Sequence, residues 1–345
     1  MVPDDEPGGD WTAPGVYRCA PDVYRIPLPL PNDGLRAVNV YALVDGDGFT
    51  LVDSGWALQQ SRELLVSALA DLGGGLGDVR RFLVTHVHRD HYAMAVTLRQ
   101  EFGARVYLGE GEKPGLDRLN AGGLAFAGQE PRLIRAGADD LLRRLQSQPR
   151  PRIDPVEWSL PDEWITDGAV FTVGEGEAQR ELTAIATPGH TRGHVVFADD
   201  PAGLLFGGDH VLPRITPSIG FEPMPGSSPL SDFLSSLELV RSRPDALLLP
   251  AHGPVGMRVH ERVDQLLAHH ATRLDQTLAA VREGRSTAVE VAGALRWTRR
   301  ERRLDELDVF NEMLAVLETL AHLDVLVERG ALRFTLDGDV ARYTI

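Results

Sequence analysis

Thr85-His86-Val87-His88-Arg89-Asp90-His91 places three imidazoles and one carboxylate within six consecutive residues, 86–91. The whole chain has 345 residues and 11 histidines, so this stretch holds a large share of them. Imidazole and carboxylate are the usual side-chain ligands of Zn²⁺ and similar divalent ions. The stretch therefore predicts a metal site.

The flanking residues predict how this stretch is held. Residues 81–85 are apolar and β-rich, which is typical of a short buried strand, and residues 90–102 suit a helix. The stretch would then be a strand-to-helix turn. His86 and His88 are two residues apart and would point the same way from an extended segment. Asp90 and His91 would lie on the first helical turn, able to face a second ion.

Four further predicted strands end in an acid or a histidine. Asp53 follows residues 51–52, His190 follows 182–186, Asp209 follows 204–208 and His252 follows 247–250. Each residue taken alone could be an ordinary turn residue, because Asp, Gly and His are common at turns. Together with the 86–91 stretch, these four strand ends predict that the side chains of all these residues converge on one edge of the sheets.

Two β-rich halves frame these tips. Strands are predicted at 23–28, 38–44 and 49–52, with a hairpin turn at 45–48 and a helix at 60–72. A second strand-rich half lies near 165–210. This pattern favours an α+β fold in which two sheets pack face to face and helices cover them. Residues 1–15 are rich in Pro, Gly and Asp and are predicted to be a flexible arm.

The ordered series Asp53, His86-x-His88-x-Asp90-His91, His190, Asp209 and His252 resembles the metallo-β-lactamase superfamily over residues 20–260. The resemblance implies an αββα sandwich domain, here residues 16–260, with a binuclear site at one edge. It implies one metal on His86, His88 and His190 and a second on Asp90, His91 and His252. Asp209 would bridge the two ions, and Asp53 would orient a ligand.

This resemblance also implies the chemistry. Two divalent ions, with zinc expected and iron or manganese left open, would hold a bridging hydroxide at neutral pH and polarise a carbonyl or phosphoryl oxygen. Asp90 and Asp209 would be the catalytic carboxylates, and Asp90 could orient the hydroxide. His210 is expected beside the ligands in an orienting or structural role. Binuclear β-lactamases usually carry a cysteine at the position of Asp209, so antibiotic hydrolysis is not expected.

Residues 109–167 are predicted to be an insertion that forms a lid. Trp158 and Trp164 could contact an apolar acyl group there, or could instead anchor the insertion in the core. Arg214 closely follows Asp209 and could meet a substrate anion or form a structural salt bridge.

Residues 261–345 form a second predicted domain. Helices are expected at 262–282, 288–295 and 304–327, followed by a hairpin with an Asp337-Gly338 turn. This order resembles the winged-helix appendage of the subgroup around the mammalian β-lactamase-like protein 2, which includes single-strand endoribonucleases. A basic run that includes Arg299 and Arg303 could contact phosphate, although nearby acids dilute it. The domain could also line the cleft or form a homodimer surface.

The sequence therefore leaves two functions open. The first is hydrolysis of a small-molecule ester or thioester, of the acyl-thioester or hydroxyacylglutathione (glyoxalase II-like) kind. The second is metal-dependent cleavage of single-stranded RNA, which the net charge of −15 disfavours. A single cysteine and the absence of a signal-peptide or membrane-span pattern predict a cytoplasmic protein without membrane contact.

Overall fold

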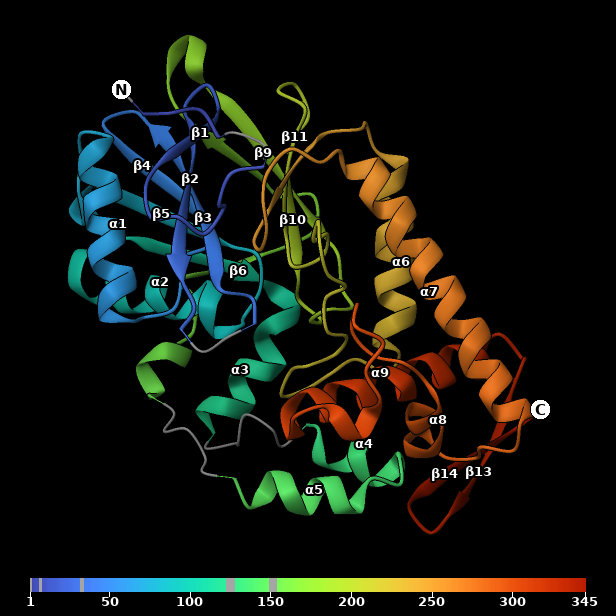
Figure 1. Cartoon of the computed structure of the whole chain (residues 1–345). Coiled ribbons are helices and arrows are strands. Elements are labelled where there is room, and N and C mark those ends of the chain that lie inside the picture. The colour runs from blue at the N-terminus through green and yellow to red at the C-terminus, as the bar shows by residue number, and fades with distance from the viewer. Residues whose placement is uncertain (1, 6–7, 32–33, 122–127, 149–153) are drawn as a thin grey trace.

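The computed structural model describes residues 2–5, 8–31, 34–121, 128–148 and 154–345 (Figure 1). The strands are β1 (Tyr17–Ala20), β2 (Val23–Pro29), β3 (Ala37–Asp45), β4 (Gly48–Val52), β5 (Val79–Val84), β6 (Arg105–Gly109), β7 (Glu163–Ile165), β8 (Val170–Val173), β9 (Arg180–Ala186), β10 (Val195–Asp199), β11 (Leu204–Gly208), β12 (Leu247–Pro250), β13 (Arg333–Asp337) and β14 (Val340–Thr344). The α-helices are α1 (Gln59–Asp71), α2 (Arg89–Phe102), α3 (Lys113–Asn120), α4 (Glu130–Arg135), α5 (Asp139–Gln146), α6 (Pro229–Ser242), α7 (Val259–Arg282), α8 (Ala288–Ala294) and α9 (Val309–Glu328).

The first sheet has seven strands in the order β1-β2-β3-β4-β5-β6-β7. Pairing is antiparallel from β1 to β4 and parallel from β4 to β7. Side chains alternate between two faces along each strand. On β3, Val40 and Ala42 belong to the core beneath α1 and α2, whereas Tyr41 and Leu43 belong to the core between the two sheets.

The second sheet has five strands in the order β12-β11-β10-β9-β8. Leu182 and Phe197 face the first sheet, and Ile185 and Val196 face the helices on the other side. Helices α6 and α7 cover that outer face, as Figure 1 shows in yellow and orange. The two sheets therefore lie between two layers of helices, and the predicted αββα architecture is confirmed.

The N-terminal segment differs from the free arm that its composition predicts. Asp5 forms a buried ion pair with Arg25 of β2 at 2.5 Å, and the Arg25 guanidinium also donates to the carbonyl of Trp11 at 2.7 Å. Trp11 is 8% exposed. The described part of the segment is therefore docked on the first sheet, because a buried guanidinium needs these acceptors. Residues 1 and 6–7 of the predicted arm lie outside the described residues.

Two helices of the predicted insertion pack against the C-terminal region, whereas its last strand, β7, pairs with β6 of the first sheet. Leu133 and Leu141, on α4 and α5, share a core with the C-terminal helix α9. Arg135 pairs with Asp324 of α9 at 2.6 Å, which ties α4 to the same helix. The described helices α4 and α5 therefore form part of the support for α9. Residues 122–127 and 149–153 of the insertion lie outside the described residues.

The C-terminal region has the predicted order of three helices and a hairpin. Helix α9 begins at Val309 rather than at residue 304, because the Asp308 side chain accepts hydrogen bonds from Phe310 N and Asn311 N and caps the helix there. Residues 304–306 form a separate 3₁₀ turn. Among the described residues, none of the helices has the length and apolar character needed to cross a membrane.

Candidate metal centre

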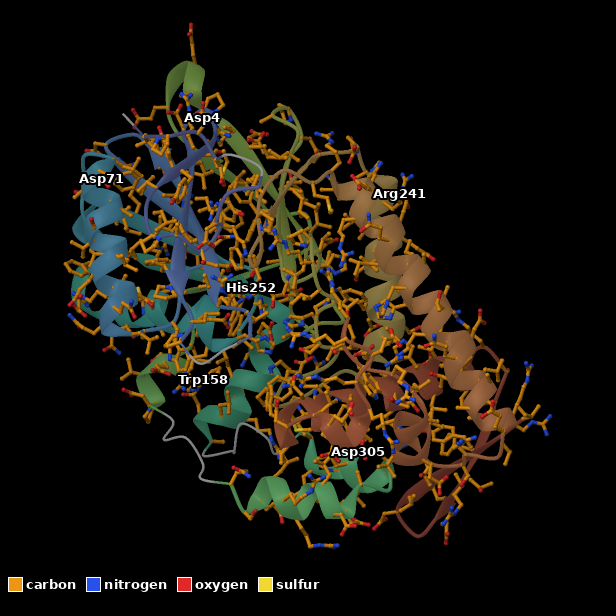
Figure 2. The ribbon with its side chains drawn as sticks, viewed as in Figure 1. Asp4, Asp71, Trp158, Arg241, His252 and Asp305 are labelled. Carbon is orange, nitrogen blue, oxygen red and sulfur yellow. The ribbon has the colours of Figure 1, made fainter. Side chains whose placement is uncertain are left out.

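Five strand ends bring the predicted ligands to one edge of the sandwich. The parallel pair β4–β5 aligns Val52 with Leu83, so Asp53 and the 86–91 stretch leave the first sheet together. In the second sheet β9, β11 and β12 run in the same direction and end before His190, Asp209 and His252. Figure 2 labels His252 in the middle of the molecule, at the ends of the sheets. The seven predicted ligands form two adjoining groups.

Three imidazole nitrogens of the first group face one another. His86 Nε2 lies 3.0 Å from His88 Nδ1, and His190 Nε2 lies 3.2 Å and 3.0 Å from these two atoms. For comparison, two nitrogen ligands at 2.0–2.1 Å from a tetrahedral ion are about 3.3 Å apart. The triangle therefore has nearly the size of one face of a tetrahedral metal site.

The remaining ring nitrogens fix the tautomers of this group. His88 Nε2 lies 2.7 Å from the carbonyl of Phe221, and His190 Nδ1 lies 2.6 Å from the carbonyl of Ser218. A carbonyl only accepts, so each of these nitrogens carries the proton. The His88 and His190 nitrogens in the triangle consequently present lone pairs to each other. Facing lone pairs repel, whereas a cation between them would use both.

The second group contains Asp90, His91 and His252. His252 Nε2 lies 3.4 Å from the Asp90 carboxylate, and His91 Nε2 lies 3.5 Å from it. His252 Nδ1 donates to the carbonyl of Ala37 at 2.7 Å, and His91 Nδ1 lies 2.9 Å from Asp53 Oδ2. These partners hold both rings with Nε2 directed at the group.

Asp53 contacts both ends of the strand-to-helix turn that carries the ligands. Its carboxylate accepts from the backbone N–H of Thr85 at 2.8 Å and from the Thr85 hydroxyl at 2.9 Å, in addition to its contact with His91. Its φ of +60° lies in the left-handed region, which Asp tolerates better than most residues. Asp53 thus connects the end of β4 to Thr85, just before the 86–91 stretch, and to His91 at its end.

Asp209 lies between the two groups. Its Oδ2 is 3.5 Å from His190 Nε2, and its Oδ1 is 3.3 Å from His252 Nε2 and 3.7 Å from His91 Nε2. Oδ1 has no hydrogen bond within the described part of the chain, although it is buried. Gly208 permits this placement, because a Cβ there would lie 2.6 Å from the His194 ring and 2.8 Å from Thr85. A carboxylate shared by two groups is the arrangement of a bridging ligand.

The electrostatics of the site suit cations. Burial lowers the pKa of His86 and of His88, and lowers that of His190 to about 3, so these imidazoles are neutral and free to coordinate at neutral pH. Burial also opposes protonation of His91, but the negative charges of Asp90 and its neighbouring carboxylates raise the pKa of His91 above its usual value. Buried carboxylates that attract positive charge this strongly, next to neutral imidazoles, fit divalent metal ions.

Two buried glutamates that the sequence does not single out support the loops. Glu112 Oε1 accepts from the Thr191 hydroxyl at 2.5 Å and from Val87 N at 3.3 Å, which joins the loops that carry His88 and His190. Glu222 Oε1 accepts from Arg192 N at 2.7 Å. The second carboxylate oxygen of each glutamate has no hydrogen bond within the described residues. Burial raises the pKa of both, and in Glu222 the charge of Glu112 adds to the effect.

The remaining predicted residues do not join the two groups. Trp158 and Trp164 are half-buried and pack on the core beneath α1 and α2, and Figure 2 shows Trp158 well away from His252. These contacts favour the anchoring role for both rings. Arg214 is exposed, and its carbonyl accepts from Arg299. His210 is buried between the rings of His194 and Phe233.

His194 lies closer to the ligands than His210. Its Nε2 accepts from the backbone N–H of Asp209 at 3.1 Å, and its Nδ1 lies 2.8 Å from the Thr187 hydroxyl. His194 therefore fixes the backbone of the shared carboxylate, and His210 contacts the site through His194. The sequence signal for this difference is weak, because both histidines stand next to strand ends.

Comparison with known proteins extends these observations. A family model described as the metallo-beta-lactamase superfamily matches residues 33–252. The probable metallo-hydrolase YqjP of Bacillus subtilis is 24% identical and aligns with 93% of this chain and 97% of its own length. The atrochrysone carboxyl ACP thioesterase nsrC of Aspergillus novofumigatus is 26% identical, over 94% of this chain and 84% of its own length.

Two solved structures resemble nearly the whole chain. A beta-lactamase domain protein from Burkholderia ambifaria has a TM-score of 0.80 at 28% identity and covers 99% of this chain and 96% of its own. A metallo-beta-lactamase family protein from Thermus thermophilus has a TM-score of 0.73 at 30% identity. It covers 95% of this chain and 99% of its own. The likeness therefore extends beyond residue 252 and includes the C-terminal region.

Proposed function

The chain belongs to the metallo-beta-lactamase superfamily and is a metal-dependent hydrolase, and we propose that it binds two divalent metal ions and hydrolyses thioesters. The position of Asp209 carries the binuclear part of this proposal. Its two carboxylate oxygens face different histidines, His190 on one side and His91 and His252 on the other. A single-ion site would have no need for the second group.

We assign His86, His88 and His190 to one ion, Asp90, His91 and His252 to the other, and Asp209 to both. When bound, two such ions lower the pKa of water and polarise a carbonyl oxygen, and zinc is the metal we expect. The Asp90 carboxylate belongs to the second group and is 17% exposed, so it can also reach water and orient it. Asp53 and the backbone carbonyls keep the imidazoles in one orientation.

Apolar rings beside His88 support an acyl substrate. The Phe221 ring lies 6.0 Å from the His88 ring, and the Phe310 ring of α9 packs edge-on against Phe221 at 5.4 Å. Phe310 is 43% exposed. An apolar acyl or aryl group can therefore contact rings next to the ligands. The relative nsrC is named as an atrochrysone carboxyl ACP thioesterase, which agrees with a thioester substrate.

The contacts of the C-terminal region give less support to RNA cleavage. The guanidinium of Arg273 stacks over Trp297 at 4.0 Å and leaves that face of the ring occupied. Arg303 pairs with Asp305, and Arg299 donates to the carbonyl of Arg214. Helix α9 directly precedes the hairpin, where a winged-helix domain has its recognition helix. It is largely buried and carries acids but no Lys or Arg. Phosphate contacts require exposed basic groups, and this helix offers none.

The experiment is a substrate panel on one metal-loaded preparation of the full chain. Acyl-pantetheine thioesters of increasing acyl size, their oxygen-ester counterparts and labelled single-stranded RNA are compared, with Asp209→Ala as the inactive control. We expect thioester turnover that rises with acyl size and is lost in the control. RNA cleavage without thioester turnover would replace this proposal with the nuclease. Activity in thoroughly metal-free protein would overturn the mechanism.

A further inference from the structure

A third group of possible metal ligands lies away from the strand ends. His270 of α7 and Glu318 and His322 of α9 place one ligand atom each within 4.8 Å of one another. Both histidines are 0% exposed. Glu318 and His322 are four residues apart on one helix and so share a face. The group lies between α7 and α9, whereas the strand-end ligands lie at the edge of the sheets.

Hydrogen bonding among the described residues does not satisfy both of these histidines at once. His322 Nδ1 donates to the carbonyl of Glu318 at 2.8 Å, so His322 Nε2 carries a lone pair. That lone pair faces His270 Nδ1 at 3.2 Å. If His270 is protonated on Nδ1, its Nε2 is a buried acceptor with no hydrogen bond among the described residues; if it is protonated on Nε2, two lone pairs face each other. Either state is unfavourable, because a buried polar atom is left without a hydrogen-bond partner or two lone pairs face each other.

One acid and one permanently charged base act on this group. Burial raises the pKa of the Glu318 carboxyl, and the charge of Arg273, one helical turn after His270, lowers it. The Arg273 guanidinium is directed at other partners, since it stacks on Trp297 and donates to the carbonyl of Arg296 at 3.0 Å. Glu318 thus supplies the negative charge that a buried cation would need.

We propose that His270, Glu318 and His322 bind one divalent transition-metal ion of the zinc class, in addition to the ions of the strand-end site. Two imidazoles and one glutamate are a known zinc ligand set, and water would complete the coordination. The ion would bind His270 through Nδ1 and His322 through Nε2, in place of the 3.2 Å contact between these two nitrogens. It would join α7 to α9.

This position gives the ion a structural role. Helix α9 carries Phe310 at its first turn, and Phe310 packs on Phe221 beside His88. A link between α7 and α9 would hold the Phe310 ring in place against Phe221, next to the strand-end ligand His88. The ion itself would contact no substrate, because His270 and His322 are fully buried.

Metal stoichiometry of the full chain tests the proposal. Zn²⁺ bound after equilibrium dialysis is counted by mass spectrometry for wild type, His322→Ala and His269→Ala; His269 is the exposed neighbour of His270 and serves as the matched control. We expect His322→Ala to bind one equivalent less than both other proteins. Because the result is a difference between variants, it holds whether the strand-end site binds two ions, one or none. Equal stoichiometry in the three proteins would overturn the proposal.

A second variant covers the case in which His322→Ala fails to fold. Glu318→Gln keeps the shape of the side chain and removes its charge. We expect it to weaken the last equivalent of zinc at least about tenfold, because loss of even an indirect partner of a metal site costs that much. Unchanged zinc affinity, measured by competition with a coloured chelator, would show that the three residues are a hydrogen-bonded group only.

Discussion

The strand-end cluster comprises His86, His88, Asp90, His91, His190, Asp209 and His252, and the helical cluster comprises His270, Glu318 and His322. Both consist of histidines and acids, but strand ends position the first and packed helices position the second. In the strand-end cluster, His88, His190 and His252 each donate their outer nitrogen to a backbone carbonyl, and His91 lies against Asp53. In the helical cluster, His322 alone has such an anchor among the described residues. Strand ends therefore orient each ring separately, whereas the helical pair depends on how α7 and α9 pack.

The difference teaches what a catalytic metal site requires. Rings that are individually anchored keep their geometry when substrate binds and leaves. A site whose geometry comes from helix packing changes with that packing, which suits a structural ion. The following predictions test this contrast, beginning with the largest expected effect.

Removal of the shared carboxylate should have the largest effect. Asp209→Ala is expected to lower kcat/KM more than about 100-fold, because indirect partners of a metal alone contribute 10–100-fold. Zinc content should fall at the strand-end cluster and remain unchanged at the helical one. The control is Asp200→Ala, which removes an exposed acid in the turn after β10 together with its ion pair to Arg243. Activity within about tenfold of wild type would contradict the bridging assignment.

Removal of the partner of His91 should have an intermediate effect. Asp53→Ala leaves His91 Nδ1 and Thr85 without their shared acceptor, and we expect a loss of about 10–100-fold in activity or zinc affinity. Asp53→Asn is the matched control, since Asn also tolerates the positive φ and keeps one acceptor oxygen. Steady-state kinetics and zinc titration measure both variants. Equal losses in the two variants would assign the effect to charge rather than to ring orientation.

The contrast also explains what the sequence can predict. The 86–91 stretch and the strand tips at His190, Asp209 and His252 are recognisable because each follows an apolar strand, and the structure brings all of them together. His270, Glu318 and His322 give no such signal, since they lie 48 and four residues apart within ordinary helical patterns.

Other parts of the site depend on tertiary contacts that no local pattern reveals. The carbonyls of Phe221, Ser218 and Ala37 hold the ligand rings although their residue types are unrelated. Tryptophan suits both pockets and cores, so the sequence leaves both roles open for the tryptophans of the insertion, and their packing favours the core. The fold class follows from the periodicity of apolar residues. The docking of the N-terminal segment does not, because it depends on the buried ion pair between Arg25 and Asp5, which no local pattern predicts.

Replacement of a buried glutamate in the loops around the strand-end cluster should have the smallest effect. We expect it to change stability rather than turnover. Burial raises the pKa of Glu112 and Glu222, so the folded state keeps their protons to a higher pH than the unfolded state does. Stability should therefore fall as pH rises above the ordinary glutamate value of 4.5 and level off once the folded-state pKa values are passed. In Glu222→Gln only Glu112 of this pair can still ionise, so the variant should lose less stability than wild type as the pH rises.

Thermal unfolding of wild type and Glu222→Gln across pH measures the effect. Each unit of pKa shift removed corresponds to about 1.4 kcal/mol. The variant should gain stability relative to wild type at mildly alkaline pH and gain little near the ordinary glutamate pKa. Parallel curves for the two proteins would show that Glu222 is ionised in the folded state throughout.

The division of ligands between the two sheets has a consequence for folding. His86, His88, Asp90 and His91 follow a strand of the first sheet, whereas His190, Asp209 and His252 follow strands of the second. Neither sheet alone offers a complete site, so metal binding is thermodynamically linked to the packing of the sandwich. An ion at 100 times its dissociation constant would add about 2.7 kcal/mol to the stability of the folded state. The resistance of this protein to unfolding should therefore track the metal supply of its surroundings.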